Sequence, residues 1–176
     1  MFSNILSSND EKLVYTQLTS FFNNIKNDEK IDYLTNLWTN LKNNLFYLIA
    51  IWILGLSVIG LIINNFLLFF KSFTLGFIIG SIINTYLYSG LILSFAYIFP
   101  NLLINLFIYI IMVYYANDIS LKLFNVLFKK KEQHFNIIIK KYLQLLGILS
   151  LIIFMSSLYE TFITPFVLKL FSFLIK

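Results

Sequence analysis

The longest uncharged run in the chain constrains the fold more than any other feature. Residues Leu45 to Asn117 form a stretch of 73 residues that contains a single charged side chain, Lys71. A helix needs about 20 apolar residues to cross a bilayer, so this stretch is long enough for more than one crossing. It predicts an all-α, polytopic membrane protein in which the other segments are arranged around several spanning helices.

Composition excludes several classes of protein. The chain of 176 residues has 59% hydrophobic residues and no Cys, which rules out disulfides, thiolate metal sites and cysteine nucleophiles. Its net charge is +5, and the only basic stretch, Asp118–Lys141, has six of the 13 lysines and lies beside the apolar segments. That distribution is typical of a cytoplasmic membrane face and not of a nucleic-acid surface. We expect no cofactor and no metal; the lone His134, which lies among lysines, is interpreted as a solvated residue.

Residues 1–44 are polar, with an apolar stripe at helical spacing. Ser8 and Glu11 stand at capping-box spacing, and Asn27-Asp28-Glu29 restarts the pattern. We predict a helical hairpin that lies on the membrane surface or on the protein's own membrane domain, forming an extracytoplasmic segment (1–44) that precedes a membrane domain (45–176). The stripe consists of Val14, Leu18, Phe21, Phe22 and Ile25, followed by Leu34, Leu37, Trp38, Leu41 and Leu45.

The first part of the uncharged run predicts one full span and one short helix. Leu45–Phe70 is interpreted as a continuous spanning helix, Lys71 as a tight turn, and Phe73–Leu87 as a short helix ending in an interfacial turn at Tyr86–Gly90. Gly55 and Gly60 are positions at which helix backbones could approach closely, and small residues at four-residue spacing from Gly76 to Asn84 favour a helix-packing seam, with a pore lining as the alternative there. The seam residues are Gly55, Gly60, Gly76, Gly80 and Asn84.

A proline interrupts the last part of the run. Leu91–Phe99 and Asn101–Tyr115 are apolar pieces on either side of Pro100, which cannot donate a backbone hydrogen bond and disfavours helix at Phe99. A broken backbone at membrane depth needs polar partners, and Asn101 and Asn105 are suitable. A kinked, packed helix and a ligand site of the transporter type both stay open.

The remaining segments fix the ends of the membrane domain. Asp118–Lys141 carries six Lys against two acids, a charge of +4, and is predicted to be a cytoplasmic loop with Lys129, Lys130, Lys131, Lys140 and Lys141. Tyr142–Tyr159 is a further span. Glu160 then precedes Thr164 and Pro165, a helix N-cap and first helical residue, and the final helix Phe166–Lys176 is predicted to lie in the interface plane.

These assignments predict about four spans, one of them short and one broken by proline. With the basic loop inside, Lys71 lies inside, and the Gly90 turn, residues 1–44 and the C-terminus lie outside. A polar N-terminal segment would then cross without a leader. We therefore expect that the chain lacks a first spanning helix.

Four pieces in order resemble the membrane region of the stage II sporulation protein M family. They are Tyr47–Gly60, Leu68–Gly80, Gly90–Leu103 and Glu160–Pro165. The resemblance covers roughly residues 45–176, with weaker similarity in residues 5–44, and implies about five spans in family members, one more than here. The broader family has His-Gly and an acid near the proline, where this chain has Asn101 and Asn105.

The resemblance implies a non-enzymatic scaffold in a multi-pass, septal or mother-cell membrane. Family members are expected to hold a peptidoglycan amidase/endopeptidase and a lytic transglycosylase during forespore engulfment. Residues 1–44 and 160–176 would face such partners, and the lipid bilayer would surround the spanning helices. Whether the protein forms a homo-oligomer is left open. The competing hypothesis is a small transporter or channel around the Pro100 break. An intramembrane enzyme is the weakest, because the spans contain no Ser/His, His/His or Asp/Asp constellation.

Overall fold

The computed structural model describes residues 12, 13, 16, 17, 19, 20, 32–98, 101–129 and 135–171, and this part of the chain is all-α. Its main helices are α2 (Tyr33–Gly55), α3 (Gly60–Ile98), α4 (Leu102–Lys129), α5 (Phe135–Phe162) and α6 (Thr164–Phe171). The predicted amphipathic stripe before Asp32 lies largely outside the described residues. The all-α prediction is confirmed.

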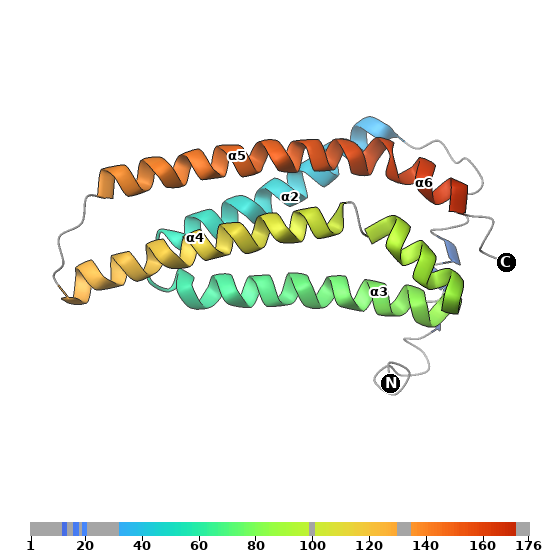
Figure 1. Cartoon of the computed structure of the whole chain (residues 1–176), viewed down its shortest axis with the longest axis horizontal. Coiled ribbons are helices and arrows are strands. Elements are labelled where there is room, and N and C mark those ends of the chain that lie inside the picture. The colour runs from blue at the N-terminus through green and yellow to red at the C-terminus, as the bar shows by residue number, and fades with distance from the viewer. Residues whose placement is uncertain are drawn as a thin grey trace.

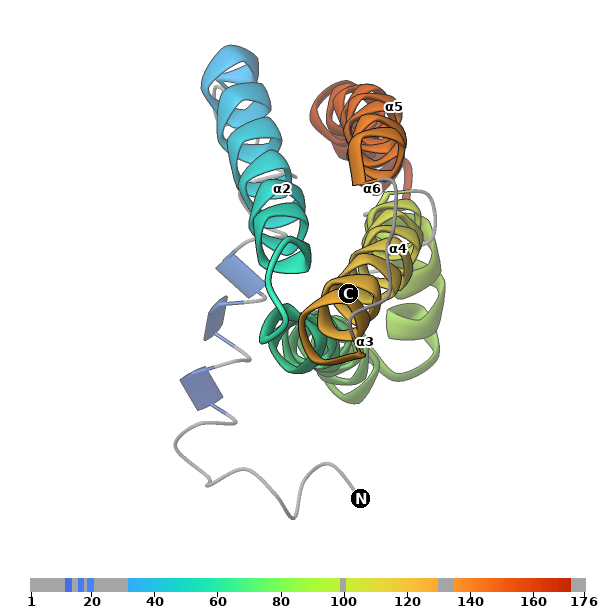
Figure 2. The ribbon, with the colours of Figure 1, turned by 90° about the vertical axis from the view of Figure 1, so that its left-hand side faces the viewer.

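Helices α2 to α5 lie side by side in an elongated bundle (Figure 1). α2 ends and α3 begins at the end of the bundle where α4 stops and α5 starts, which we call the Lys129 end. α2 starts, α3 bends and α6 lies at the opposite end, the Tyr33 end. Viewed along the bundle, α4 lies between α3 and α5, with α2 opposite (Figure 2). The buried core follows from this arrangement and includes Leu48, Ile51, Ile108, Tyr109, Met112, Val113 and Ile153.

The outer surface of the bundle is apolar. Three helical segments are long and apolar enough to cross a membrane: Gly60–Ile92, Leu102–Phe128 and Asn136–Val167. Large hydrophobic side chains point outward from all of them, as expected where lipid replaces water. They include Phe66, Phe69, Phe73, Phe107, Tyr114, Leu151 and Met155. The chain is therefore a multi-pass membrane protein.

The predicted continuous span Leu45–Phe70 is wrong, because the chain reverses between Gly55 and Gly60. The last turn of α2 tightens, with the amides of Leu56 and Ser57 each donating to a carbonyl three residues earlier at 3.0 Å. A Cβ at Gly60 would lie 1.7 Å from the carbonyl oxygen of Leu54. Only glycine permits this close approach, so the two glycines mark a turn and not one helix.

Lys71 was also misassigned: it lies inside α3 and not in a turn. Phe73–Leu87 is accordingly the continuation of one helix from Gly60. The chain bends at Leu87, where φ is 49° and ψ is −124°, inside the predicted turn Tyr86–Gly90. The piece after the bend packs directly on α3, because a Cβ at Gly90 would lie 2.4 Å from the carbonyl oxygen of Ile82.

α4 is longer than predicted. It begins at Leu102, directly after the predicted break, and continues past Tyr115 to Lys129. Most of the predicted basic loop is thus helical, since α5 resumes at Phe135. An ion pair from Lys122 to Asp118, one turn earlier, supports the extension. Phe99, Pro100, Lys130 and Lys131 lie outside the described residues.

α2 starts with a local cap. The Asp32 carboxylate accepts hydrogen bonds from the Thr35 hydroxyl and, at 3.4 Å, from the Thr35 amide. These bonds hold the pKa of Asp32 below its ordinary value, because they stabilise the ionised form. α2 continues through residues 44 and 45, so the proposed domain boundary falls inside one helix. The extracytoplasmic placement of 1–44 stays a prediction.

The C-terminal helices match the predicted order with a shift of one residue. α5 contains the predicted span Tyr142–Tyr159. The Val167 amide donates to the Ile163 carbonyl at 3.0 Å, which makes Ile163 the N-cap and Thr164 the first residue of α6. Pro165 is in the first turn, where no intrahelical donor is required. The interfacial position of α6 stays a prediction.

Candidate functional site

Asn101 is the centre of a buried polar cluster at the start of α4. Its carbonyl accepts the first helical hydrogen bond of α4, from the Asn105 amide at 3.0 Å, so it occupies the N-cap position. Its side chain, only 2% exposed, accepts from the Ser156 hydroxyl of α5 and from Asn105 Nδ2 at 3.3 Å. The interrupted backbone is thereby joined to the neighbouring helix.

Glu160 extends this cluster toward the end of α5. The Asn101 side chain interacts favourably with the partly buried Glu160 carboxylate. Asn101 thus links Asn105 and Ser156, whose side chains donate to its Oδ1, to Glu160. The structure thus brings together the predicted helix break (Asn101, Asn105) and the predicted C-terminal motif, whose Thr164 is also buried.

A second group of polar side chains lies around Lys71. Its ammonium nitrogen is 5.2 Å from the ring centroid of Tyr47 on α2 and 5.6 Å from that of Tyr109 on α4. The Tyr109 hydroxyl donates to Asn44 Oδ1 at 2.9 Å. The negative faces of two aromatic rings attract a cation that lipid would exclude, so they offset part of the cost of placing Lys71 inside the bundle.

A small cavity of about 70 Å³ adjoins Lys71. Asn44, Lys71 and Asn105 line it together with apolar side chains of α3 and α4. Asn105 is 3% exposed, and its Oδ1 has no hydrogen-bond partner among the described residues. The space is large enough for more than one water molecule. Lys71 and Asn105 supply a donor and an acceptor, so the cavity is suited to water or a small polar group.

Lys71 and Glu160 also interact electrostatically across the cluster. No salt bridge of 4 Å or less joins them. Opposite charges on α3 and α5 thus add a longer-range attraction between two helices that cross the apolar region. The Ser156 hydroxyl donates to an amide oxygen, which cannot take its proton, so this hydrogen bond is not that of an activated nucleophile. No group of three or more potential metal ligands occurs in the described part of the chain.

A comparison with known families identifies the chain. A model of the stage II sporulation protein M family matches residues 1–165. The chain belongs to this family. No curated protein and no solved structure matches it.

The match includes residues 1–44, where the sequence resemblance was weak, and it ends at Pro165, the last residue of the Glu160 motif. Family membership makes the chain a sporulation-related membrane protein, as the resemblance implied. The polar cluster therefore belongs to the membrane region of a member of the stage II sporulation protein M family.

The predicted seam residues do not form one packing face, although Gly55 and Gly60 meet at the turn between α2 and α3, where a Cβ at Gly60 would lie 3.2 Å from the Gly55 nitrogen. Gly55 is at the Lys129 end, where an added Cβ would lie 2.3 Å from Tyr142 Oη and 2.7 Å from Ala116 Cβ. Gly76 faces open space, with nothing within 4 Å of an added Cβ. Gly80 is half-buried and Asn84 exposed. Close packing through glycine thus occurs at Gly55, and whether the Gly76 face contacts another helix stays a prediction.

Hydroxyl groups complete the Gly55 contact. Ser120 of α4 donates to the carbonyls of Gly55 (3.1 Å) and Ser57 (2.8 Å), and Tyr142 of α5 donates to the carbonyl of Trp52 (3.1 Å). The C-terminal carbonyls of α2 lack helical partners, so these side chains satisfy them inside the bundle. The basic residues are nearby: Lys129 ends α4, and Lys140 and Lys141 are exposed on α5.

Sequence reasoning missed several members of the Asn101 cluster and of the group around Lys71, namely Asn44, Tyr47, Lys71, Tyr109 and Ser156. Of these residues, Lys71 is the one that the sequence pattern could most readily have revealed. It is flanked by Phe69, Phe70 and Phe73, and no Gly, Pro or Asn turn signal adjoins it. A lone charge in such a run is better interpreted as an intramembrane residue that faces the bundle interior.

Proposed function

We propose that the protein is a non-enzymatic membrane scaffold that recruits peptidoglycan-degrading enzymes to the septum during forespore engulfment. The partners would be an amidase/endopeptidase and a lytic transglycosylase, as the resemblance to the family implies. Membership of the family supports the sporulation role. The observation that carries the docking role is that the two segments expected to face partners meet at the Tyr33 end.

Tyr33, the first residue of α2, stacks on Phe162, the last residue of α5. Their ring centroids are 5.6 Å apart and their planes differ by 9°. This contact joins residues 32–44 to residues 160–171, which are far apart in sequence. Both segments are thus held on one helical framework, so a partner can contact them together.

The first half of α2 has the composition of a partner-binding surface. Leu34 and Trp38 are 78% and 67% exposed, yet Thr35, Asn36 and Thr39 stand beside them. α2 is not among the three segments that are long and apolar enough to cross a membrane. An exposed tryptophan among polar residues favours contact with a protein, since tryptophan is enriched at interface hot spots.

The test is recovery of the two enzymes with the full chain from sporulating cells after crosslinking. The double substitution Leu34→Ser with Trp38→Ala should reduce recovery at least tenfold, because hot-spot truncations cost about 2 kcal/mol or more. The matched control is Leu127→Ser with Phe128→Ala at the Lys129 end, where the two side chains are 67% and 70% exposed. That variant should recover both enzymes at the level of the unsubstituted chain.

Equal recovery with both variants would contradict the assignment of this docking surface. Removing residues 1–32 and 172–176 as well, with recruitment still intact, would contradict the docking role of the terminal segments. Membrane levels of each variant, measured in the same cells, separate lost recruitment from lost protein.

A second candidate function, transport of a small polar solute, has one observation in its favour. The cavity beside Lys71 has the polar side chains of Asn44, Lys71 and Asn105 in a lining that is otherwise largely apolar. Its test is solute or ion flux into proteoliposomes, compared with the Lys71→Met variant. Flux that exceeds that of empty liposomes and disappears with Lys71→Met would favour transport over the scaffold role.

A further inference from the structure

A groove at the Lys129 end is separate from the polar cluster. It lies between α4 and α5 and has a volume of about 470 Å³, within the range of small-ligand sites. Both helices belong to segments long enough to cross a membrane. The groove therefore adjoins lipid along its length, and its natural occupants come from the bilayer.

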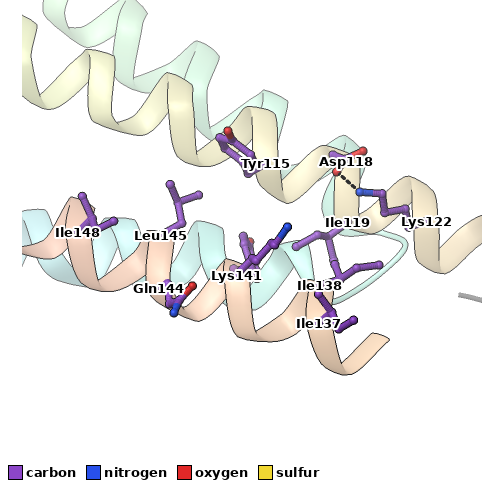
Figure 3. A pocket seen from close by; sticks show the side chains of 11 residues that line it. Tyr115, Asp118, Ile119, Lys122, Ile137, Ile138, Lys141, Gln144, Leu145 and Ile148 are labelled. Atoms are coloured by element: carbon purple, nitrogen blue, oxygen red, sulfur yellow. Dashed lines mark hydrogen bonds and ion pairs between the residues drawn. The ribbon is translucent and has the colours of Figure 1, made fainter. Parts of the chain in front are cut away.

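One end of the groove carries a positive charge excess. Lys122 of α4 is paired with Asp118, whereas Lys141 of α5 has no carboxylate within 4 Å among the described residues. Figure 3 shows the Lys141 ammonium directed across the groove toward the Asp118–Lys122 pair. Two lysines and one aspartate give a net charge of +1, so a ligand with one negative charge would neutralise this group.

Apart from Gln144 and the hydroxyl groups of Tyr115 and Tyr142, the rest of the lining is apolar. Leu145 and Ile148 of α5 continue the groove away from Lys141, toward Tyr115 on α4 (Figure 3). A ligand that fits both parts has an anionic head and a hydrocarbon tail. A soluble anion would match Lys141 and Lys122 but would leave the apolar part unfilled.

We propose that this groove binds one anionic phospholipid, with its phosphate between Lys122 and Lys141 and an acyl chain along Leu145 and Ile148. Basic pockets between spanning helices bind lipid headgroups in this way. The site fixes the lipid against both α4 and α5 and so joins the two helices beside their basic connection.

The test uses the full chain purified in a neutral detergent and analysed by native mass spectrometry. Phosphatidylglycerol and phosphatidylcholine with the same acyl chains are compared as probes. The unsubstituted chain should retain one phosphatidylglycerol in preference to phosphatidylcholine. Lys141→Gln should weaken this retention about fivefold, as expected for the loss of one lysine near a lipid phosphate.

Lys140→Gln is the matched control, since Lys140 is the exposed neighbour of Lys141 and does not line the groove. It should retain phosphatidylglycerol like the unsubstituted chain. Equal loss with both variants would show general surface attraction and overturn the site, as would equal retention of the two lipids. Glycerol 3-phosphate at the same concentration should not displace phosphatidylglycerol. Displacement would show that the phosphate alone is bound and that the acyl part of the proposal is wrong.

Discussion

α4 contacts its neighbours in two different ways along its length. At the Lys129 end, Ala116 packs on the backbone of Gly55, and a single added carbon would collide with Tyr142 and Ala116. At its start, Asn101 and Asn105 make hydrogen bonds to side chains, and a cavity of about 70 Å³ remains beside them. The contact at the Lys129 end depends on close steric fit, and the contact at the start of α4 depends on hydrogen bonds. The two contacts should therefore respond to opposite kinds of substitution.

The largest effect is expected from Gly55→Val. The added side chain has to displace Ala116 and Tyr142, and overpacking of this kind costs about 1–3 kcal/mol. The measurement is the free energy of unfolding of the purified chain in mixed micelles with a denaturing detergent. Gly76→Val is the control, because nothing lies within 4 Å of its Cβ position. A loss of stability as large for Gly76→Val as for Gly55→Val would contradict the assignment of a close steric contact at Gly55.

Asn101→Leu should cost about 1.2 kcal/mol, since it removes two side-chain hydrogen bonds and such bonds between membrane helices average about 0.6 kcal/mol each. The same unfolding experiment measures this loss. A double-substitution cycle with Ser156→Ala sharpens the result, because the two changes remove the same hydrogen bond and their costs should not add. Full additivity would show that the Asn101–Ser156 bond contributes nothing.

Lys71→Met should have a smaller effect, about 1 kcal/mol, from the loss of its contacts with the Tyr47 and Tyr109 rings. It also leaves Glu160 without its opposite charge. Adding Glu160→Gln to Lys71→Met should therefore cost less than Glu160→Gln alone costs in the unsubstituted chain. Equal costs would show that the two charges are not coupled.

The smallest effect concerns the start of α2, where the cap is local and not tertiary. The folded-state pKa of Asp32 is lowered, so its contribution to helix stability is present above the unfolded-state pKa of about 3.8 and is lost as the pH falls through the folded-state value. Amide exchange of Thr35 and Asn36 should increase in that acidic window. Thr35→Val, which removes the side-chain donor, should move the increase to higher pH. An unchanged midpoint would contradict the cap.

Sequence reasoning succeeded where long composition patterns carry the information. The uncharged run around Lys71 predicted a polytopic helical protein, and the four motif pieces predicted the family that matches residues 1–165. The bend at Leu87 falls within the turn predicted at Tyr86–Gly90. These predictions depend on segment length and on local backbone chemistry, both of which can be inferred directly from the sequence.

The turn between α2 and α3 was missed for a physical reason. Leu56 to Ile59 lacks Pro and charge, so its composition is that of a span, and hydropathy cannot separate a turn from a helix there. The chain reverses because Gly55 and Gly60 allow close contacts with Tyr142, Ala116 and the Leu54 carbonyl. Those partners come partly from α4 and α5, more than 50 residues further along the chain.

The sequence by itself determined that the chain is a helical membrane protein of the stage II sporulation protein M type, because apolar length and motif order are properties of the chain alone. The tertiary structure decided which polar residues meet. Lys71 lies beside Tyr47 and Tyr109, and Asn101 meets Ser156 and Glu160, because α2, α3, α4 and α5 pack side by side. A polar side chain in an apolar segment requires a partner, but only helix packing determines which one it finds.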